Sequence, residues 1–253
     1  MIEVDKLTMK YGNFKALDGI SFKVREREIL GLLGPNGAGK TTAMRIMTTY
    51  LHPTEGTVRV HGRDVLKNPL EVRREIGYLP ETAPLYLDMQ AGEYLRFVGE
   101  ARGLRGARLQ ERLGWLQEAC QIRGVWKHSL SEVSKGYRQR VGLAQALIHD
   151  PRVLILDEPT SGLDPLQIIG IRDLVRELSR EKTILFSTHI LSEVEAMADR
   201  IVIVNEGRVV AEGTREELAR KVQEQGETKT ILTLEDIFIA LLKPRGAKGV
   251  LHV

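Results

Sequence analysis

Residues Gly34–Thr41 read GPNGAGKT, and this stretch determines the fold expected for the chain. It fits the pattern G-x-x-x-x-G-K-[ST]. It lies between the short apolar run Ile29–Leu33, typical of a buried strand, and a helix predicted over Lys40–Leu51. Glycines let backbone N–H groups curl around phosphate oxygens, and the helix N-terminus adds its dipole. Since average residue frequencies produce such a match in roughly one chain in a hundred of this length, the stretch predicts a nucleotide site.

The polar residues of this stretch have separate expected tasks at a nucleotide. Lys40 would reach the β- and γ-phosphates and assist catalysis, and Thr41 would ligate Mg²⁺. The residues expected to bind the nucleotide are Gly34, Pro35, Asn36, Gly37, Ala38, Gly39, Lys40, Thr41 and Thr42. The alternative, an ordinary glycine-rich turn, does not account for the strand and helix on either side.

Two acids end a second apolar run, Val153–Leu156, which is followed by Asp157 and Glu158. Neighbouring side chains at the exit of a strand point to different sides. Asp157 can therefore hold the Mg²⁺ shell while Glu158 faces an attacking water as general base. The alternative is a helix-capping acid followed by a surface acid. The glycine-rich stretch in the same chain favours the catalytic interpretation.

Working outward, the pattern alternates strands and helices except in one interval. Residues 82–149 have helical periodicity without a convincing strand, which predicts an inserted helical subdomain. Asp164 and Pro165 open a helix as N-cap and first residue. The expected strands are 7–11, 20–24, 29–33, 56–61, 153–156, 184–187, 201–204 and 208–211, and the other expected helix is 191–198. Strands separated by helices predict a mainly parallel sheet in an α/β fold.

Composition excludes several classes of protein. The 253 residues carry 37 Lys and Arg against 34 Asp and Glu, a formal charge of +3, so electrostatics do not favour a nucleic-acid binder. The single cysteine, Cys120, excludes an intrachain disulfide, fits a reducing compartment and is expected to be a buried helix residue. The N-terminus lacks the layout of a signal peptide and no apolar run approaches 18 residues. We therefore expect a chain that does not cross a membrane by itself.

Five motifs follow one another along the chain in an order that is typical of one protein family. Residues 133–140 read VSKGYRQR and precede a helix, with Ser134 as its expected N-cap; alone, they would be ordinary capping. The order is the glycine-rich stretch, SKGYRQR, the Asp-Glu strand, SGLD at 161–164 and a lone His189 after a strand. In this order the chain resembles the ATP-binding cassette (ABC) ATPases over about residues 2–212.

That resemblance implies roles for residues which the patterns alone leave open. Two cassettes of this family close head to tail, so Ser134 and Gly136 would bind the γ-phosphate held by the partner's glycine-rich loop. Residues 161–164 would link the two sites across the dimer, and His189 would hold the γ-phosphate and the water. Tyr11 matches the aromatic residue that stacks on adenine. Its alternative is burial, because Leu7, Met9 and Tyr11 share a sheet face.

The sequence departs from the family pattern at two positions. Glu81 stands where the family usually has a glutamine, and we expect it to ligate Mg²⁺ through its carboxylate. Lys135 stands where the family's signature motif has its first glycine, while Ser134 and Gly136 keep the serine and the second glycine of that motif. This motif and the short tail are most similar to multidrug, sodium and gliding-motility exporter ATPases.

The resemblance implies an α/β fold with a P-loop NTPase core, an N-terminal antiparallel β subdomain and the helical subdomain. The cassette would span residues 2–232, and residues 214–253 would form a helical extension and tail. The chain would be the cytoplasmic ATPase subunit of an exporter, using ATP and Mg²⁺. It would pair with a second copy or a related cassette and lie on the inner face of the membrane through a separate permease. The alternatives are a soluble cassette ATPase acting on DNA or ribosomes, a non-hydrolysing regulatory module, and a GTPase or small-molecule kinase.

Overall fold

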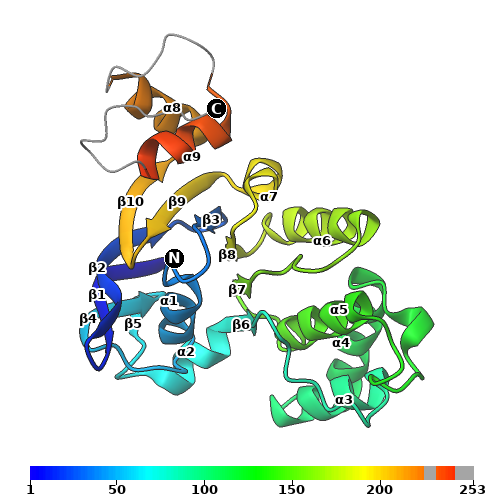
Figure 1. Ribbon diagram of the computed structural model, residues 1–253. Coiled ribbons are helices and arrows are strands. Elements are labelled where there is room, and N and C mark those ends of the chain that lie inside the picture. The colour runs from blue at the N-terminus through cyan, green and yellow to red at the C-terminus, as the bar shows by residue number, and fades with distance from the viewer. Residues whose placement is uncertain (225–231, 243–253) are drawn as a thin grey trace.

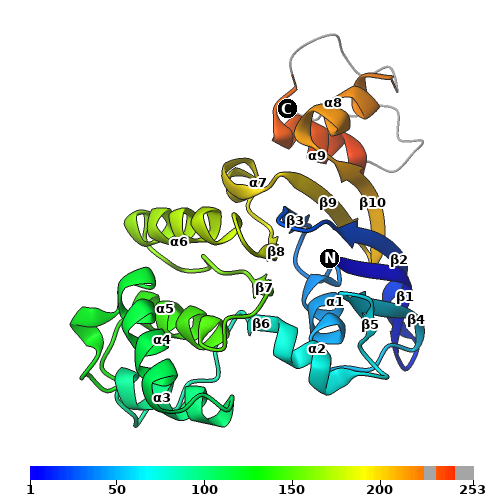
Figure 2. The ribbon, with the colours of Figure 1, turned by 180° about the vertical axis from the view of Figure 1, so that it is seen from behind.

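The computed structural model describes residues 1–224 and 232–242, which form two sheets and several groups of helices (Figure 1). The end of the expected extension and tail, residues 243–253, lies outside the described residues. Viewed from behind in Figure 2, the helices α3, α4 and α5 form one lobe, and the antiparallel strands lie on the opposite side of the larger sheet.

The larger sheet has six strands in the order β10-β9-β3-β8-β7-β6. All neighbours are parallel except β9 and β10. The strands are β3 (Ile29–Leu33), β6 (Ile76–Leu79), β7 (Val153–Asp157), β8 (Thr183–Thr188), β9 (Arg200–Asn205) and β10 (Arg208–Gly213). The α/β fold with a mainly parallel sheet is therefore confirmed.

Both faces of this sheet are covered, which explains the continuous apolar runs. Along β7, Leu154 and Leu156 belong to one hydrophobic core, with residues of α5 (Lys135–Leu147), α6 (Pro165–Leu178) and α7 (Leu191–Met197). Val153 and Ile155 belong to a second core, with α1 (Lys40–Met47) and the smaller sheet. A strand buried on both sides needs apolar residues at every position.

The smaller sheet is antiparallel, as expected, with the strand order β2-β1-β4-β5. Its strands are β1 (Ile2–Tyr11), β2 (Phe14–Val24), β4 (Glu55–Val60) and β5 (Arg63–Asp64). Buried residues of β1, β2, β4 and α1 share one core. This packing places Tyr11 and Phe14, which flank the β1–β2 turn, on the same pocket as the first residues of α1.

The interval 82–149 contains the helices α3 (Ala91–Ala101), α4 (Gly106–Ala119) and α5, with a short 3-10 helix at Arg123–Val125. The described residues of this interval form one isolated bridge, Gln90 to Ser129, and no strand. Cys120 is buried after α4, as expected, and burial raises the pKa of its thiol to about 12.

Two local expectations need correction. The first helix ends at Met47 instead of Leu51, because Thr49 has a φ of 65° and the carbonyl of Arg45 accepts from the N–H groups of Tyr50 and Leu51. Helix α2 (Pro69–Glu75) and strand β6 were not foreseen, since four residues of strand at a sheet edge have too little periodicity.

The last described helices begin where the sequence places capping residues. Thr214 and Glu217 exchange hydrogen bonds at the start of α8 (Arg215–Glu224). Thr233 and Asp236 do the same at the start of α9 (Leu234–Leu242). Both are capping boxes, in which side chains satisfy the free N–H groups of the first turn.

Candidate functional site

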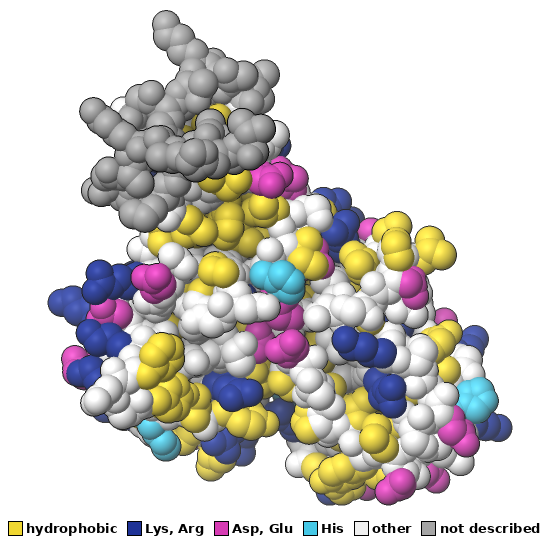
Figure 3. All heavy atoms as spheres, viewed as in Figure 1, with side chains coloured by type: hydrophobic (Ala, Val, Ile, Leu, Met, Phe, Trp, Pro, Cys, Tyr) yellow, Lys and Arg dark blue, Asp and Glu magenta, His cyan; other side chains and the backbone are white. Residues whose placement is uncertain are grey.

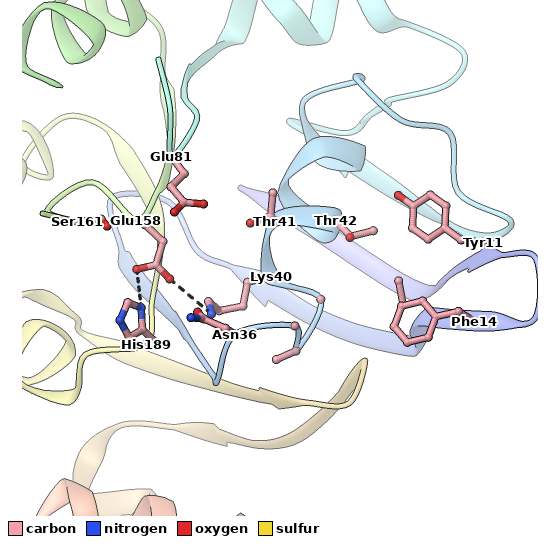
Figure 4. Close-up of a pocket in the computed structure, with 14 residues that line it drawn as sticks. Tyr11, Phe14, Asn36, Lys40, Thr41, Thr42, Glu81, Glu158, Ser161 and His189 are labelled. Atoms are coloured by element: carbon pink, nitrogen blue, oxygen red, sulfur yellow. Dashed lines mark hydrogen bonds and ion pairs between the residues drawn. The ribbon is translucent and has the colours of Figure 1, made fainter. Parts of the chain in front are cut away.

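A pocket of about 550 Å³ lies at the carboxyl ends of the parallel strands. Residues 36–42 line it, with Tyr11 and Phe14 at one end and Glu81, Glu158 and His189 toward the other (Figure 4). In the space-filling view, acidic side chains and a histidine lie next to one another near the middle of this face (Figure 3). Crevices at this edge of a parallel sheet are the usual ligand sites of such folds.

The glycine-rich loop turns tightly between β3 and α1. Gly39 has a φ of 102°, and a Cβ there would lie 2.6 Å from the carbonyl oxygen of Ala16. A Cβ on Gly34 would lie 2.2 Å from the carbonyl oxygen of Val204. Side chains larger than hydrogen are therefore excluded at both positions.

Lys40 is buried under this loop. Its Nζ donates to the carbonyl oxygens of Gly34 at 2.8 Å and Pro35 at 3.2 Å. The loop and the ammonium group thus hold each other in place. The same ammonium group could donate to phosphate oxygens in place of these carbonyls.

Glu158 lies between a lysine and a histidine (Figure 4). Its Oε1 is 3.5 Å from Nζ of Lys40, and its Oε2 is 3.0 Å from Nδ1 of His189. Its backbone has a φ of 48°, and its N–H donates to Oγ of Ser187 at 3.0 Å. The carboxylate of this buried residue therefore has a fixed orientation toward the pocket.

Asp157 points to another side, as the strand geometry predicts. Its Oδ1 accepts from Oγ1 of Thr41 at 3.2 Å and from Oγ of Ser187 at 2.6 Å. Its Oδ2 is buried without a hydrogen-bond partner in the described structure. A buried carboxylate oxygen without a partner is costly unless a cation or a water satisfies it.

The donor set at this place fits Mg²⁺. Thr41 and Asp157 supply hard oxygens, and Glu81 lines the same pocket from the loop after β6. Among the described residues no group of three His, Cys, Asp or Glu could hold a metal. Mg²⁺ in nucleotide sites needs no such group, because phosphates and waters complete its octahedron.

Two aromatic rings, not one, form the far end of the pocket. Tyr11 is 48% exposed and Phe14 is 64% exposed, on either side of the β1–β2 turn. The alternative expectation, burial of Tyr11 with Leu7, is wrong. Register shifts along β1 break the shared face that the alternation suggested. Phe14 was missed, although an aromatic residue three positions after Tyr11 was a signal for it.

The SKGYRQR motif lies away from this pocket. Ser134 is exposed and caps α5, accepting from the N–H of Tyr137 at 3.4 Å. Gly136 is buried, and a Cβ there would meet the side chain of Gln167 at 2.0 Å. Ser161 lines the pocket, and Asp164 caps α6. Neither Ser134 nor Gly136 contributes to the pocket of its own chain.

Sequence comparison identifies the class to which this fold and site belong. The profile of the ABC transporter family matches residues 17–161. The chain belongs to this family: it is an ATP-binding cassette ATPase of the transporter type. Among the described residues, no helix has the length and apolar character needed to span a membrane.

Two similar sequences and one similar solved structure describe the relationship in more detail. It is 39% identical over 237 residues to the uncharacterized ABC transporter ATP-binding protein YxlF of Bacillus subtilis, covering 94% of this chain and 78% of that one. It is 40% identical over 218 residues to the daunorubicin resistance ATP-binding protein DrrA3 of Streptomyces coeruleorubidus, covering 86% and 69%. A dimeric post-hydrolysis structure of the cassette MJ0796 with ADP and phosphate superposes with a TM-score of 0.78 at 25% identity, covering 85% and 98%.

Proposed function

We propose that this chain binds ATP with Mg²⁺ in the pocket at the glycine-rich loop and drives export through a separate membrane permease. The observation that carries the proposal is the position of Glu158, fixed between Lys40 and His189 beside the loop. A carboxylate held there can accept a proton from water beside the γ-phosphate.

In the proposed binding step, Lys40 exchanges its carbonyl partners for phosphate oxygens. Backbone N–H groups of residues 36–42 surround the phosphates, and Tyr11 or Phe14 stacks on the adenine. Thr41, Asp157 and Glu81 would hold Mg²⁺, whose chemical contribution is to neutralise charge on the β- and γ-phosphates.

In the proposed hydrolysis step, Glu158 accepts the proton of the attacking water. His189 contacts Glu158 at 3.0 Å and would orient both this carboxylate and the γ-phosphate. Lys40 stabilises the charge that develops on the transferred group.

The pocket of one chain lacks the SKGYRQR motif, which supports a dimer as the working form. Ser134 is exposed at the start of α5, free to face the γ-phosphate in a second copy or a related cassette. Gly136, in the first turn of the same helix, is covered by the side chain of Gln167, which would have to move before an anion could reach its backbone. The MJ0796 cassette, whose post-hydrolysis structure is dimeric, supports a dimer as the working form.

We further propose that the permease docks beside Glu81. A groove of about 340 Å³ lies there, lined by residues 81–85 and by Lys135 and Arg138 of α5. Movement of Glu81 on nucleotide binding would be transmitted to this groove.

The chain would then be cytoplasmic and peripheral at the membrane through its permease, with no nucleic-acid partner. The drug-resistance name of DrrA3 supports export as the direction.

We propose that the chain consists of a cassette and a C-terminal extension. The cassette would span residues 2–232 and include the helical subdomain at 82–149. Residues 214–253 would form an extension, and α8 and α9 are its described part. Their position at the end of the molecule away from α3 and α4 supports a separate task (Figure 1).

Glu158→Gln tests the hydrolysis step. The amide cannot accept a proton, so turnover should fall by roughly a hundredfold or more, while ATP binding persists because the glycine-rich loop is unchanged. Glu177→Gln, an exposed carboxylate on α6, is the matched control and should keep wild-type turnover. Equal turnover in Glu158→Gln and wild type would refute the role of this residue.

The permease is tested with the same variant. A tagged Glu158→Gln chain, trapped with ATP and Mg²⁺ in its native cells and solubilised gently, should co-purify with a multi-helix membrane protein in stoichiometric amount. Recovery of ribosomes, DNA or soluble proteins alone would contradict the transport proposal and leave the ATPase activity untouched.

A further inference from the structure

A carboxylate outside the nucleotide pocket is buried behind it. Glu193 lies on α7, four positions after His189, and is 1% exposed. No ion pair to Glu193 occurs among the described residues. Its Oε2 accepts from Oγ1 of Thr188 at 2.6 Å, and its Oε1 accepts from Oγ1 of Thr160 in a short hydrogen bond.

One of these contacts is explained by helix capping. Glu193 is the third residue of α7, where a glutamate usually reaches back to the N–H of the capping residue. Here Thr188 relays the contact, because its Oγ1 accepts from the N–H of Ile190 at 3.0 Å and donates to Glu193. A cap of this kind needs one carboxylate oxygen.

The second oxygen has no part in capping. It holds Thr160, which is two residues after Glu158 and 33 positions before Glu193. The intervening Pro159 is held from another side, since its carbonyl accepts from Nε2 of Gln139 on α5 at 3.1 Å. The loop that carries Glu158 is thus tied to both α7 and the helix that begins at the SKGYRQR motif.

We propose that Glu193 is a positioning residue for ATP hydrolysis, which fixes the Glu158 loop against the His189 loop through Thr160 and Thr188. Each of the two loops carries one partner of the 3.0 Å contact between Glu158 and His189. Freeing either loop would lengthen or misalign that contact. The inference rests on the roles proposed for these two residues.

The chemistry of the buried group supports this role. Burial of a carboxylate without a cation is unfavourable, and an apolar side chain would fill the same space at lower cost. Apolar contacts have no preferred direction. The two hydrogen bonds of Glu193, in contrast, fix the hydroxyl groups of Thr160 and Thr188 in both position and angle. A polar group of this kind specifies one arrangement of the loops, and nothing else in α7 reaches Thr160 through a described hydrogen bond.

Four variants of the full chain separate positioning from general stability. Glu193→Ala removes both contacts. Glu193→Gln keeps both, because the amide accepts from one hydroxyl and donates to the other. Thr160→Val removes only the tie between the loops and leaves the cap intact. Val194→Ala, a buried apolar truncation on the same helix, is the matched control for lost stability.

The measurements are kcat, KM for ATP with Mg²⁺, and the melting temperature. Glu193→Ala and Thr160→Val should lower kcat roughly ten- to a hundredfold, because a misplacement of about 1 Å has effects of that size. KM should change less than about twofold, since no described hydrogen bond joins Glu193 directly to residues 34–42. Glu193→Gln should restore most of kcat, and Val194→Ala should lower the melting temperature with kcat unchanged.

Several results would overturn the inference. If Glu193→Gln is as slow as Glu193→Ala, or if Thr160→Val turns over like wild type, the two hydrogen bonds do not position the loops. If Val194→Ala loses kcat in proportion to its melting temperature as Glu193→Ala does, the effect is one of stability. Should Glu193→Ala fail to fold, Thr160→Val and Glu193→Gln still decide. A Glu158→Gln variant with wild-type turnover would instead refute the catalytic assignment itself.

Discussion

Acid should weaken the attachment of the helical lobe to the core sheet through His149. This residue follows α5, and its Nε2 donates to the carbonyl oxygen of Ile76 in β6 at 3.0 Å. Its Nδ1 is buried without a described hydrogen-bond partner. Burial, with a smaller contribution from Arg102, lowers the pKa of His149 from 6.5 to about 4. The folded chain therefore resists the proton that the unfolded chain takes up.

The sign and size of the effect follow from proton linkage. Above pH 6.5 neither state is protonated here, and the full stability is present. As the pH falls from 6.5 toward 4, only the unfolded state gains the proton, so the free energy of unfolding decreases. At pH 5 the decrease is about 2 kcal/mol, from 1.5 pH units at about 1.4 kcal/mol each.

His149→Gln tests this, because the amide can still donate to Ile76 and does not titrate. Urea unfolding of wild type, His149→Gln and His128→Gln at pH 7.5 and 5 isolates the contribution of one imidazole. His128 is exposed, and its replacement controls for the loss of a histidine. Wild type and His128→Gln should lose about 2 kcal/mol more on acidification than His149→Gln. Equal acid losses in wild type and His149→Gln would refute the reasoning.

Three further predictions concern the pocket and the lone thiol. Tyr11→Ala should raise KM for ATP roughly 5- to 150-fold with kcat unchanged, since stacking on a base is worth about 1–3 kcal/mol; Phe14→Ala in the same kinetic assay ranks the two rings, and unchanged KM in both would exclude stacking. Gly39→Ala should abolish ATP binding measured by calorimetry, because its Cβ would lie 2.6 Å from Ala16; wild-type affinity would contradict this. Cys120, with its pKa raised to about 12 by burial, should resist iodoacetamide until urea unfolds the chain, as followed by mass spectrometry; rapid labelling of the folded chain would contradict its burial.

The parts of the fold that sequence predicts well are those with local causes. β3 and β7 are buried on both faces, so each is a continuous apolar run. Ser134 and Asp164 cap helices by bonding to N–H groups three positions away. The edge strand β6 was missed because four residues, one of them Gly77, have no periodicity to read. Its place is set by pairing with β7, which lies far along the chain.

Candidate site residues divide in the same way. The glycine-rich loop is contiguous, and the task of Lys40 follows from its position in the loop. Ser187 was missed because its hydroxyl matters only through contacts with Asp157 and the N–H of Glu158, about thirty positions away. Glu193 was missed for the same reason: in the sequence it is one polar residue of a short helix, and its partners Thr160 and Thr188 are brought to it only by the fold. Hydrogen bonds between residues far apart in the chain produce no regular spacing that could be recognised in the sequence.

The order of strands explains why residues so distant in sequence still form one site. The glycine-rich loop follows β3, His189 follows β8, Glu158 follows β7 and Glu81 follows the unforeseen β6. In the sheet these four strands are consecutive and parallel, so their four exit loops lie side by side at one edge. The sequence requires only that loops after parallel strands share an edge. Because β8 lies between β3 and β7, the His189 loop lies beside both the Glu158 loop and Lys40. Glu158 can therefore contact Lys40 and His189 at the same time.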